Sequence, residues 1–281
     1  MSDRSSVVDH YSSGQLLDAI RTSIEEAGLS TDSVTVDDLA PLDEFHVGGR
    51  EASQALVDQL GLTAEHHVLD VGCGLGGTAR FVADKFGCRV TGLDVTPEFV
   101  GTGRVMNDWV GLLDRIDLHA GSAVEMPFED DAFDAAFMLH VGMNIGDKAR
   151  LFAEVARVLK LDGVFGIYDI MRTSYEPLVY PVPWAGDSDI SVLCAAEDYR
   201  QVLEQSGFAI ENVRDRWAFA SEFFDATQRR TQQSGMPILG LQIVMGDNAS
   251  EKVRNMVDNL MNHRVSPVEM IARKRAAIVG D

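Results

Sequence analysis

A short glycine-rich segment that follows an apolar run constrains the fold of this chain more than any other feature. Residues 68–77 read Val-Leu-Asp-Val-Gly-Cys-Gly-Leu-Gly-Gly. The apolar run predicts a buried strand, the glycines predict a tight turn, and a helix is expected from about Thr78. Glycine is favoured where the backbone must turn sharply or approach a ligand closely. The segment therefore predicts a strand–turn–helix unit of an α/β sheet.

Strands and helices are expected to alternate after this segment begins. The predicted strands are 67–71, 89–94, 115–119, 133–139 and 163–169, and the predicted helices are 77–86, 97–112 and 147–159. Alternation of this kind indicates parallel strands joined by right-handed helical crossovers.

The two ends of the chain are expected to differ from this pattern. The predicted elements are a helix over 5–28, an irregular segment over 30–45 around Pro41, a helix over 48–60, a loop over 180–184, a helix over 195–206, a strand over 208–214, a mostly helical stretch over 218–262 and a strand over 265–275. The helical stretch is an insertion between the last two strands. It should lie above the carboxyl ends of the sheet, where ligands of open α/β sheets bind.

Composition narrows the classes of function. The chain has 281 residues with 24 basic and 44 acidic side chains, a formal net charge of −20, which disfavours a nucleic-acid substrate. A solvated acidic surface is the simplest explanation of this charge, and a salt-adapted host is an alternative. We find no apolar run of about 18 residues, so no membrane span is expected, and no membrane is expected as a partner. The N-terminus lacks the features of a signal peptide, and three widely spaced cysteines favour a reduced, cytoplasmic protein without a metal site.

Four elements occur in a fixed order along residues 68–163. Asp70 precedes the first glycine by two residues, and Asp94 ends the run Val-Thr-Gly-Leu-Asp. Residues 120–128 read Ala-Gly-Ser-Ala-Val-Glu-Met-Pro-Phe, and residues 152–163 contain Arg-Val-Leu-Lys-Leu-Asp-Gly. In this order the elements resemble the class I S-adenosylmethionine (SAM)-dependent methyltransferases.

The resemblance implies a fold, a cofactor and the residues that hold it. The fold is α/β: a Rossmann-like, seven-stranded, mostly parallel sheet with helices on both faces. We expect one domain, divided into an N-terminal helical cap (1–60), a SAM-binding core (61–170) and a substrate-side region (171–281), with the first helix and the insertion over 218–262 as a lid. The cofactor is SAM, without a metal. Its expected contacts are Tyr11, Asp70, Gly72, Cys73, Gly74, Gly76, Asp94, Val95, Ser122, Ala123 and His140.

Two of these elements depart from the pattern of the resembled family. Ser122 stands where an aspartate is common, so we expect the backbone of Ala123 to meet the adenine more than the side chain of Ser122. Leu161 and Asp162 replace the usual proline and glycine of the last run. Asp70 could instead accept hydrogen bonds from the backbone amides of its own turn. Asp94 could instead be the N-cap of the helix that begins at Pro97.

Other functions share parts of this pattern. The spacing of Gly72, Gly74 and Gly77 also matches the dinucleotide fingerprint, so a nicotinamide oxidoreductase is an alternative. A SAM-sensing or scaffold protein is the non-enzymatic alternative. The run over 120–128 favours a methyltransferase over the oxidoreductase, and the intact glycine and carboxylate positions disfavour the non-enzymatic alternative.

The substrate must be inferred from weaker signals. The segments 43–50, 140–145 and 180–184 together resemble bacterial type 11 methyltransferases described as sarcosine/dimethylglycine N-methyltransferase-like. That resemblance implies a small amine as acceptor. A quinol, phenol or other apolar metabolite, methylated on carbon or oxygen, is the alternative, and the apolar residues of 236–245 could line its pocket or form a homodimer face.

Several side chains could act in the transfer itself. His46 and His140 are the candidate catalytic groups, because histidine titrates near neutrality. The candidate substrate contacts are Arg50, Asn144, Arg172, Tyr180 and Trp184. Most of them have an alternative role: His46 as a hydrogen-bonded structural histidine, His140 as a cofactor contact, the arginines as surface or structural residues, Asn144 as the cap of helix 147–159, Trp184 as a loop anchor, and Tyr11 as core.

Overall fold

Seven strands form one sheet in the computed structural model, which describes residues 8, 14–246 and 248–276. The strands are β1 (His67–Val71), β2 (Arg89–Asp94), β3 (Ile116–Ala120), β4 (Phe133–Leu139), β5 (Leu159–Arg172), β6 (Phe208–Asp215) and β7 (Val265–Lys274). Their order is β3-β2-β1-β4-β5-β7-β6. Only β7 runs antiparallel to its neighbours, β5 and β6. The predicted mostly parallel, seven-stranded fold is confirmed.

The order reverses between β1 and β4, which lie side by side in the middle of the sheet. The chain moves outward from β1 to β2 and β3 and then returns to place β4 on the other side of β1. A reversal of this kind opens a crevice at the carboxyl ends of the two strands, where ligands bind in open α/β sheets. The glycine-rich turn after β1 lies at this crevice.

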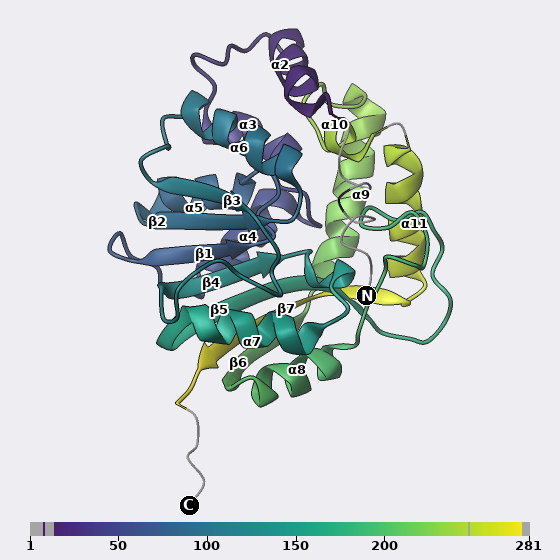
Figure 1. Cartoon of the computed structure of the whole chain (residues 1–281). Helices are drawn as coiled ribbons and strands as arrows, with labels where there is room; N and C mark the ends of the chain where they lie inside the picture. The colour runs from purple at the N-terminus through teal and green to yellow at the C-terminus, as the bar shows by residue number, and fades with distance from the viewer. Residues whose placement is uncertain (1–7, 9–13, 247, 277–281) are drawn as a thin grey trace, which may run out of the picture.

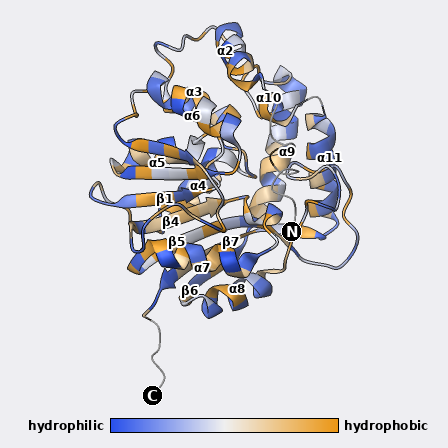
Figure 2. Ribbon diagram, viewed as in Figure 1, coloured by the Kyte–Doolittle hydropathy of each residue, from blue (hydrophilic) through white to orange (hydrophobic). Residues whose placement is uncertain are grey.

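Helices cover both faces of the sheet. They are α2 (Leu16–Glu26), α3 (Val36–Asp43), α4 (Gly49–Val57), α5 (Gly77–Phe86), α6 (Pro97–Trp109), α7 (Lys148–Val158), α8 (Ala196–Gln205), α9 (Trp217–Ser234), α10 (Gln242–Met245) and α11 (Ala249–Met261), with a 3₁₀ turn over Gly142–Asn144. Apolar side chains of α4 and α5 pack on one face, and those of α7 and α8 pack on the other. Figure 2 shows hydrophobic and hydrophilic bands alternating along α7 and α8, as expected of helices with one buried side.

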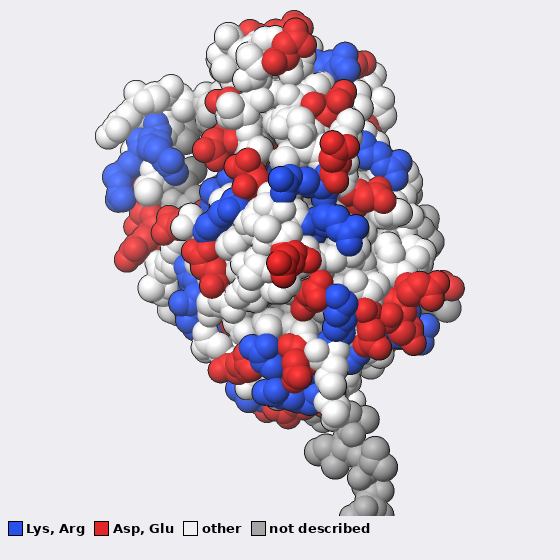
Figure 3. Space-filling view, turned by 90° about the vertical axis from the view of Figure 1, so that its left-hand side faces the viewer, with Lys and Arg blue, Asp and Glu red and all other residues white. Residues whose placement is uncertain are grey.

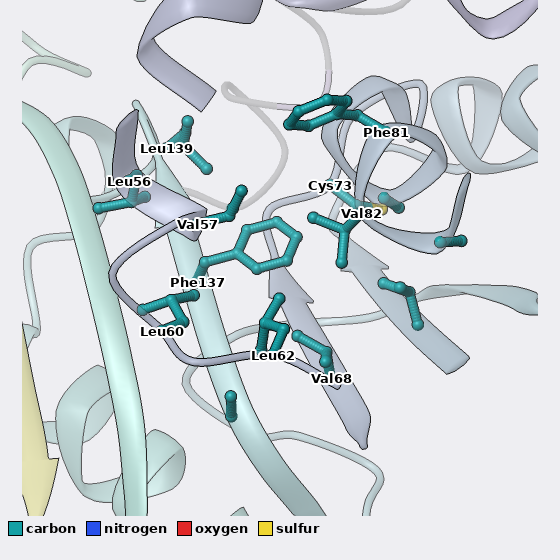
Figure 4. Packing of buried hydrophobic residues seen from close by; sticks show 14 of the residues in the cluster. Leu56, Val57, Leu60, Leu62, Val68, Cys73, Phe81, Val82, Phe137 and Leu139 are labelled. Atoms are coloured by element: carbon teal, nitrogen blue, oxygen red, sulfur yellow. The ribbon is translucent and has the colours of Figure 1, made fainter. Parts of the chain in front are cut away.

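Strand β4 shows how the sheet is buried on both faces. Phe137 is fully buried against Leu56, Leu60 and Val82, which belong to α4, the loop after it and α5 (Figure 4). The adjacent Met138 is equally buried in the core on the opposite face. Successive strand residues point to opposite faces, so a strand covered by helices on both sides is apolar throughout.

The structure corrects one expectation at the N-terminal end. Residues 30–45 were expected to be irregular, but they contain α3, which runs through Pro41. Thr35 and Asp38 form a capping box that starts the helix, and Leu39 and Leu42 are buried. A proline in so short a helix removes a single backbone hydrogen bond, which the cap and the burial offset.

Other boundaries differ by a few residues. Strand β5 begins at Leu159 and ends at Arg172, so it is longer than the predicted 163–169. Of the helix predicted over 5–28, the structure describes α2 and leaves residues 1–7 and 9–13 outside the described part of the chain.

The helices α9, α10 and α11 lie between β6 and β7 in the chain, as predicted, and stand together at one end of the sheet (Figure 1). Helix α10 contacts α2 through an apolar cluster that joins Leu239, Ile243 and Val244 to Leu16 and Ile20. The N-terminal cap and the insertion thus cover this end of the sheet together.

Acidic and basic side chains are interspersed on the opposite end of the molecule, which faces the viewer in Figure 3. This mixture agrees with a solvated acidic surface. None of the helices that the structure describes is long and apolar enough to cross a membrane.

Candidate functional site

A cavity of about 750 Å³ opens at the carboxyl ends of β1, β2 and β4. Ten of the eleven cofactor contacts predicted from the sequence fall within the described residues, and all but Gly76 line this cavity; Tyr11 lies outside the described residues. These lining residues are Asp70, Gly72, Cys73, Gly74, Asp94, Val95, Ser122, Ala123 and His140. The crevice predicted from the topology is therefore a cavity of the size usual for small-molecule ligands.

The glycines of the turn have distinct roles. Gly72 has a φ of 75°, and a Cβ atom there would lie 2.2 Å from the side chain of Val141. The loop after β4 therefore packs directly on this glycine. At Gly74, with a φ of 53°, the nearest atom to an added Cβ would be 4.0 Å away, so its backbone borders open space. Gly76 caps the start of α5. The turn combines close packing on one side with an accessible backbone on the other.

Asp94 ends β2 and contacts the turn. Its Oδ2 accepts a hydrogen bond from Gly74 N at 2.9 Å, and its Oδ1 accepts one from Thr96 N at 2.8 Å. Burial raises the pKa of this carboxyl in spite of these bonds. Each oxygen retains a lone pair, and the residue lines the cavity. Asp94 can thus hold the turn and accept hydrogen bonds from a ligand at the same time.

Two more carboxylates border the cavity with unsatisfied oxygens. Asp70 Oδ2 is buried and has no partner among the described residues, and burial raises the pKa of Asp70 well above its ordinary value. Asp43, on α3, pairs with the fully buried Arg80 at 2.6 Å, and burial raises its pKa to about 6. A cationic or hydrogen-bond-donating ligand would satisfy such carboxylates.

The far end of the cavity is formed by residues 121–124, which follow β3. Ser122 and Glu125 form an isolated bridge, so this segment turns tightly beside Asp94. Its backbone and the apolar side chains of Val124 and Phe99 suit a flat, weakly polar group such as a purine.

His46 and His140 lie together at the inner end of the cavity. Their ring centroids are 5.9 Å apart, and the ring of His140 also stacks on Tyr168. His140 has a φ of 55°, a left-handed conformation that is uncommon for a side chain of this kind and is often found at functional sites. Burial lowers the pKa of both histidines, most strongly that of His140. Both imidazoles are therefore neutral at pH 7.

A second, smaller cavity of about 80 Å³ adjoins the first. Phe45, His46 and His140 line both cavities. The remaining wall is apolar. It comes from the loop before α4, the 3₁₀ turn after β4, β5, the loop over 180–185 and the insertion over 218–262: Val47, Met143, Ile170, Pro183, Trp184, Phe223, Phe224, Leu241, Met245, Val253 and Met256. The two histidines thus stand at the boundary between a polar cavity and an apolar one.

The other predicted substrate residues are placed differently. Arg50 bonds Glu44 and Asp37, and Arg172 bonds the carbonyl groups of Ser174 and Glu176; neither arginine lines a cavity.

The polar and aromatic candidates mainly hold the loop near the second cavity. Asn144 lines the first cavity, but its amide donates to the carbonyl groups of Trp184 and Ile190. Trp184 is buried, lines the second cavity and donates to Ser191 Oγ at 3.0 Å. Tyr180 packs against the cluster around Trp184.

Some cavity residues were not found by sequence reasoning. Phe45 lies within the segment 43–50, which was singled out as a whole, and Phe223 and Phe224 lie in the predicted lid. An aromatic pair on a helix does not reveal from sequence which face it buries. Among the described residues, no group of three or more His, Cys, Asp or Glu side chains is arranged to hold a metal ion.

Comparison with known proteins gives consistent findings. Residues 69–167 match the family described as a methyltransferase domain. The methyltransferase GfsG of Streptomyces halstedii is 32% identical over 213 residues, which is 74% of this chain and 74% of that protein. The sterol 24-C-methyltransferase ERG6B of Gibberella zeae is 35% identical over 118 residues, 42% of this chain, and the match spans only 31% of that protein.

A solved structure shows the same fold. A putative sarcosine dimethylglycine methyltransferase from Galdieria sulphuraria superposes with a TM-score of 0.64, covering 92% of this chain and 98% of that one at 21% identity. At this identity, the likeness concerns the fold alone.

Proposed function

Since this chain belongs to the family of SAM-dependent methyltransferases, which methylate small molecules, we propose that it transfers the methyl group of SAM to an apolar small molecule held in the second cavity. The observation that carries this proposal is the pair of adjoining cavities. One is bordered by unsatisfied carboxylates and the other by apolar side chains, and the two histidines separate them.

The lining of the larger cavity supports SAM as its occupant. We assign Asp70, with its unpartnered buried oxygen, to the ammonium group, Asp94 to the ribose hydroxyls and residues 121–124 to the adenine. The bound cofactor supplies a methyl group that its positive sulfur already activates. The protein must then align the acceptor with this methyl group and exclude water, which the apolar wall of the second cavity favours.

The acceptor class follows from the lining of the second cavity. A carboxylate-bearing amine such as sarcosine or dimethylglycine would need a cationic clamp. Arg50 and Arg172 are both bonded elsewhere, and among the described residues that line the second cavity the only polar side chains with titratable groups are His46 and His140. The aromatic and methionine wall supports an apolar acceptor instead.

Filling the second cavity should block the acceptor without affecting the cofactor. Val253 of α11 lines this cavity, so Val253→Phe should raise the acceptor KM at least about tenfold. Val257→Phe, one turn further along α11 and outside the lining, is the matched control. Labelled methyl transfer to a panel of phenols, quinols, sarcosine, dimethylglycine and thiols gives the readout, and calorimetry gives the SAM affinity. If the protein methylated sarcosine alone, and Val253→Phe did not affect that transfer, the proposal of an apolar acceptor would be contradicted.

The affinity for SAM should fall as the solution is acidified. Burial raises the pKa of Asp43 to about 6 and also raises the pKa of Asp70 and of Asp94, so these groups take up protons at a higher pH than an ordinary carboxyl group does. A cationic ligand binds the ionised carboxylates better, so binding releases protons, and the affinity changes by up to about tenfold per pH unit for each proton released. Calorimetry between pH 5 and pH 8 tests this. S-adenosylhomocysteine retains the ammonium group assigned to Asp70 and should show a dependence of the same sign. An affinity for both ligands that does not change with pH would contradict the electrostatic explanation.

A further inference from the structure

Glu44, which follows α3, is buried beside the two cavities and accepts hydrogen bonds on both oxygens. Arg50 Nε donates to Oε1 at 2.7 Å, and Ser53 Oγ and Thr78 Oγ1 donate to Oε2 at 2.5 and 3.2 Å. A carboxyl group surrounded by donors, one of them a guanidinium, is stabilised as the carboxylate. The same Oε2 lies 3.5 Å from Nε2 of His46. A fixed negative charge thus lies behind this imidazole.

The contacts of His46 determine which of its nitrogens carries the proton. Nε2 lies 3.0 Å from the carbonyl oxygen of Gly49, which can only accept, so Nε2 is the protonated nitrogen. Ser53 Oγ gives its own proton to Glu44 and can accept from the same N–H at 3.0 Å. Nδ1 is then the basic nitrogen, and no described residue donates to it. Because the ring lines both cavities, a base is available at their boundary.

His140 lacks such support. Its Nε2 is buried without a partner among the described residues, and no carboxylate of the described chain pairs with it. The other titratable groups around His46 are Arg50, His140 and Tyr168, none of which carries a negative charge at neutral pH. A protonated His46 is therefore stabilised by Glu44, whereas a protonated His140 would remain uncompensated.

We propose that Glu44, acting partly through Ser53, is a positioning residue that makes His46 the general base of the transfer, and that the apolar acceptor reacts through a hydroxyl group, as in a phenol. The proposal rests on the proposed function. The acceptor oxygen forms a bond to the methyl carbon as the carbon–sulfur bond breaks. The electron pair of the broken carbon–sulfur bond goes to sulfur. The O–H bond of the acceptor breaks, and the proton passes to Nδ1 of His46. Bulk water then removes the proton from the imidazolium.

The test uses phenols that differ in acidity, with 4-methylphenol and 4-nitrophenol as probes at pH 8. His46→Asn should lower kcat for 4-methylphenol by about 10²-fold or more, as loss of a general base does. It should lower kcat for 4-nitrophenol much less, because that phenol is already ionised and has no proton to give. A purely structural defect would reduce both rates equally.

Glu44→Gln gives a second, independent readout. Removing the negative charge destabilises the imidazolium, so the pKa of His46 falls, and the acidic limb of the kcat/KM profile for 4-methylphenol should move to lower pH. The plateau rate should fall about tenfold, because a weaker base accepts the proton less readily. Asp58→Asn, an exposed carboxylate at the end of α4, is the matched control and should leave the profile unchanged.

Calorimetric SAM affinity, unchanged within about threefold in His46→Asn and in Glu44→Gln, shows that the cofactor site is intact. The assignment of the base would be overturned if His46→Asn lowered the rates for both phenols equally. It would also be overturned if the acidic limb of the pH profile disappeared in His140→Asn but remained in His46→Asn. Transfer to amines or thiols with inert phenols would overturn the acceptor chemistry. Absence of both SAM binding and methyl transfer to any acceptor would instead contradict the proposed function.

Discussion

Replacement of Arg80 by methionine is expected to lower the free energy of unfolding by about 3–5 kcal/mol. Arg80 has no exposed surface, and its Nη2 lies 2.6 Å from Oδ2 of Asp43, while Nη1 donates to Asn107 at 2.7 Å. Methionine fills a similar volume but leaves Asp43 buried without a counter-charge. Urea unfolding at pH 7.5, followed by circular dichroism, measures the loss.

Two further variants separate the charge from the packing. Lys85→Met on the same helix breaks an exposed pair with Asp58 and should cost no more than about 1 kcal/mol. Adding Asp43→Leu to Arg80→Met removes the uncompensated carboxylate and should recover most of the loss. A loss under 1 kcal/mol in Arg80→Met, or no recovery in the double variant, would show that the pair does not anchor α3 to α5.

The buried pair of Arg80 and Asp43 shows why the N-terminal helical cap (1–60) was harder to predict from the sequence than the core of the sheet. Between residues 67 and 169 the strands are apolar, the helices are amphipathic and the glycines mark the turns, so local pattern and tertiary structure agree. Helix α3 has a proline in its second turn, and its stability depends on the capping box at Thr35 and on contacts of Asp43 with a helix about 35 residues further along. Local pattern cannot reveal such contacts.

The residues that line the larger cavity were predictable for a related reason, whereas those that line the second cavity were not. Turn geometry brings Asp70, Gly72 and Asp94 together within one strand–turn–helix–strand unit, so their spacing in sequence carries the information. The second cavity is assembled from seven separate segments between residues 45 and 256. Arg50 shows the difference. As a lone arginine it suggested a carboxylate clamp, but the structure pairs it with Glu44, which lies six residues earlier, between α3 and α4.

Replacement of Asp94 by alanine should weaken SAM binding by about 1–3 kcal/mol, roughly 5- to 150-fold, through the loss of charge-assisted hydrogen bonds. Titration calorimetry measures the change. Asp117→Ala removes an exposed carboxylate from the neighbouring strand β3 and should leave the affinity unchanged. Stabilisation of the wild-type protein by NADH rather than by SAM in a thermal-shift assay would contradict the assignment of the cofactor.

Asp94 also accepts hydrogen bonds from Gly74 and Thr96, so a weaker affinity alone does not separate a ribose contact from a disturbed turn. An S-adenosylhomocysteine analogue without the ribose 2′-hydroxyl resolves this. If Asp94 binds the ribose, the wild-type protein should bind the analogue less tightly than S-adenosylhomocysteine. The Asp94→Ala variant should bind the two ligands with the same affinity, because the partner of the missing hydroxyl is already gone. If Asp94 only holds the turn, the two losses should add, since neither change then removes the partner of the other.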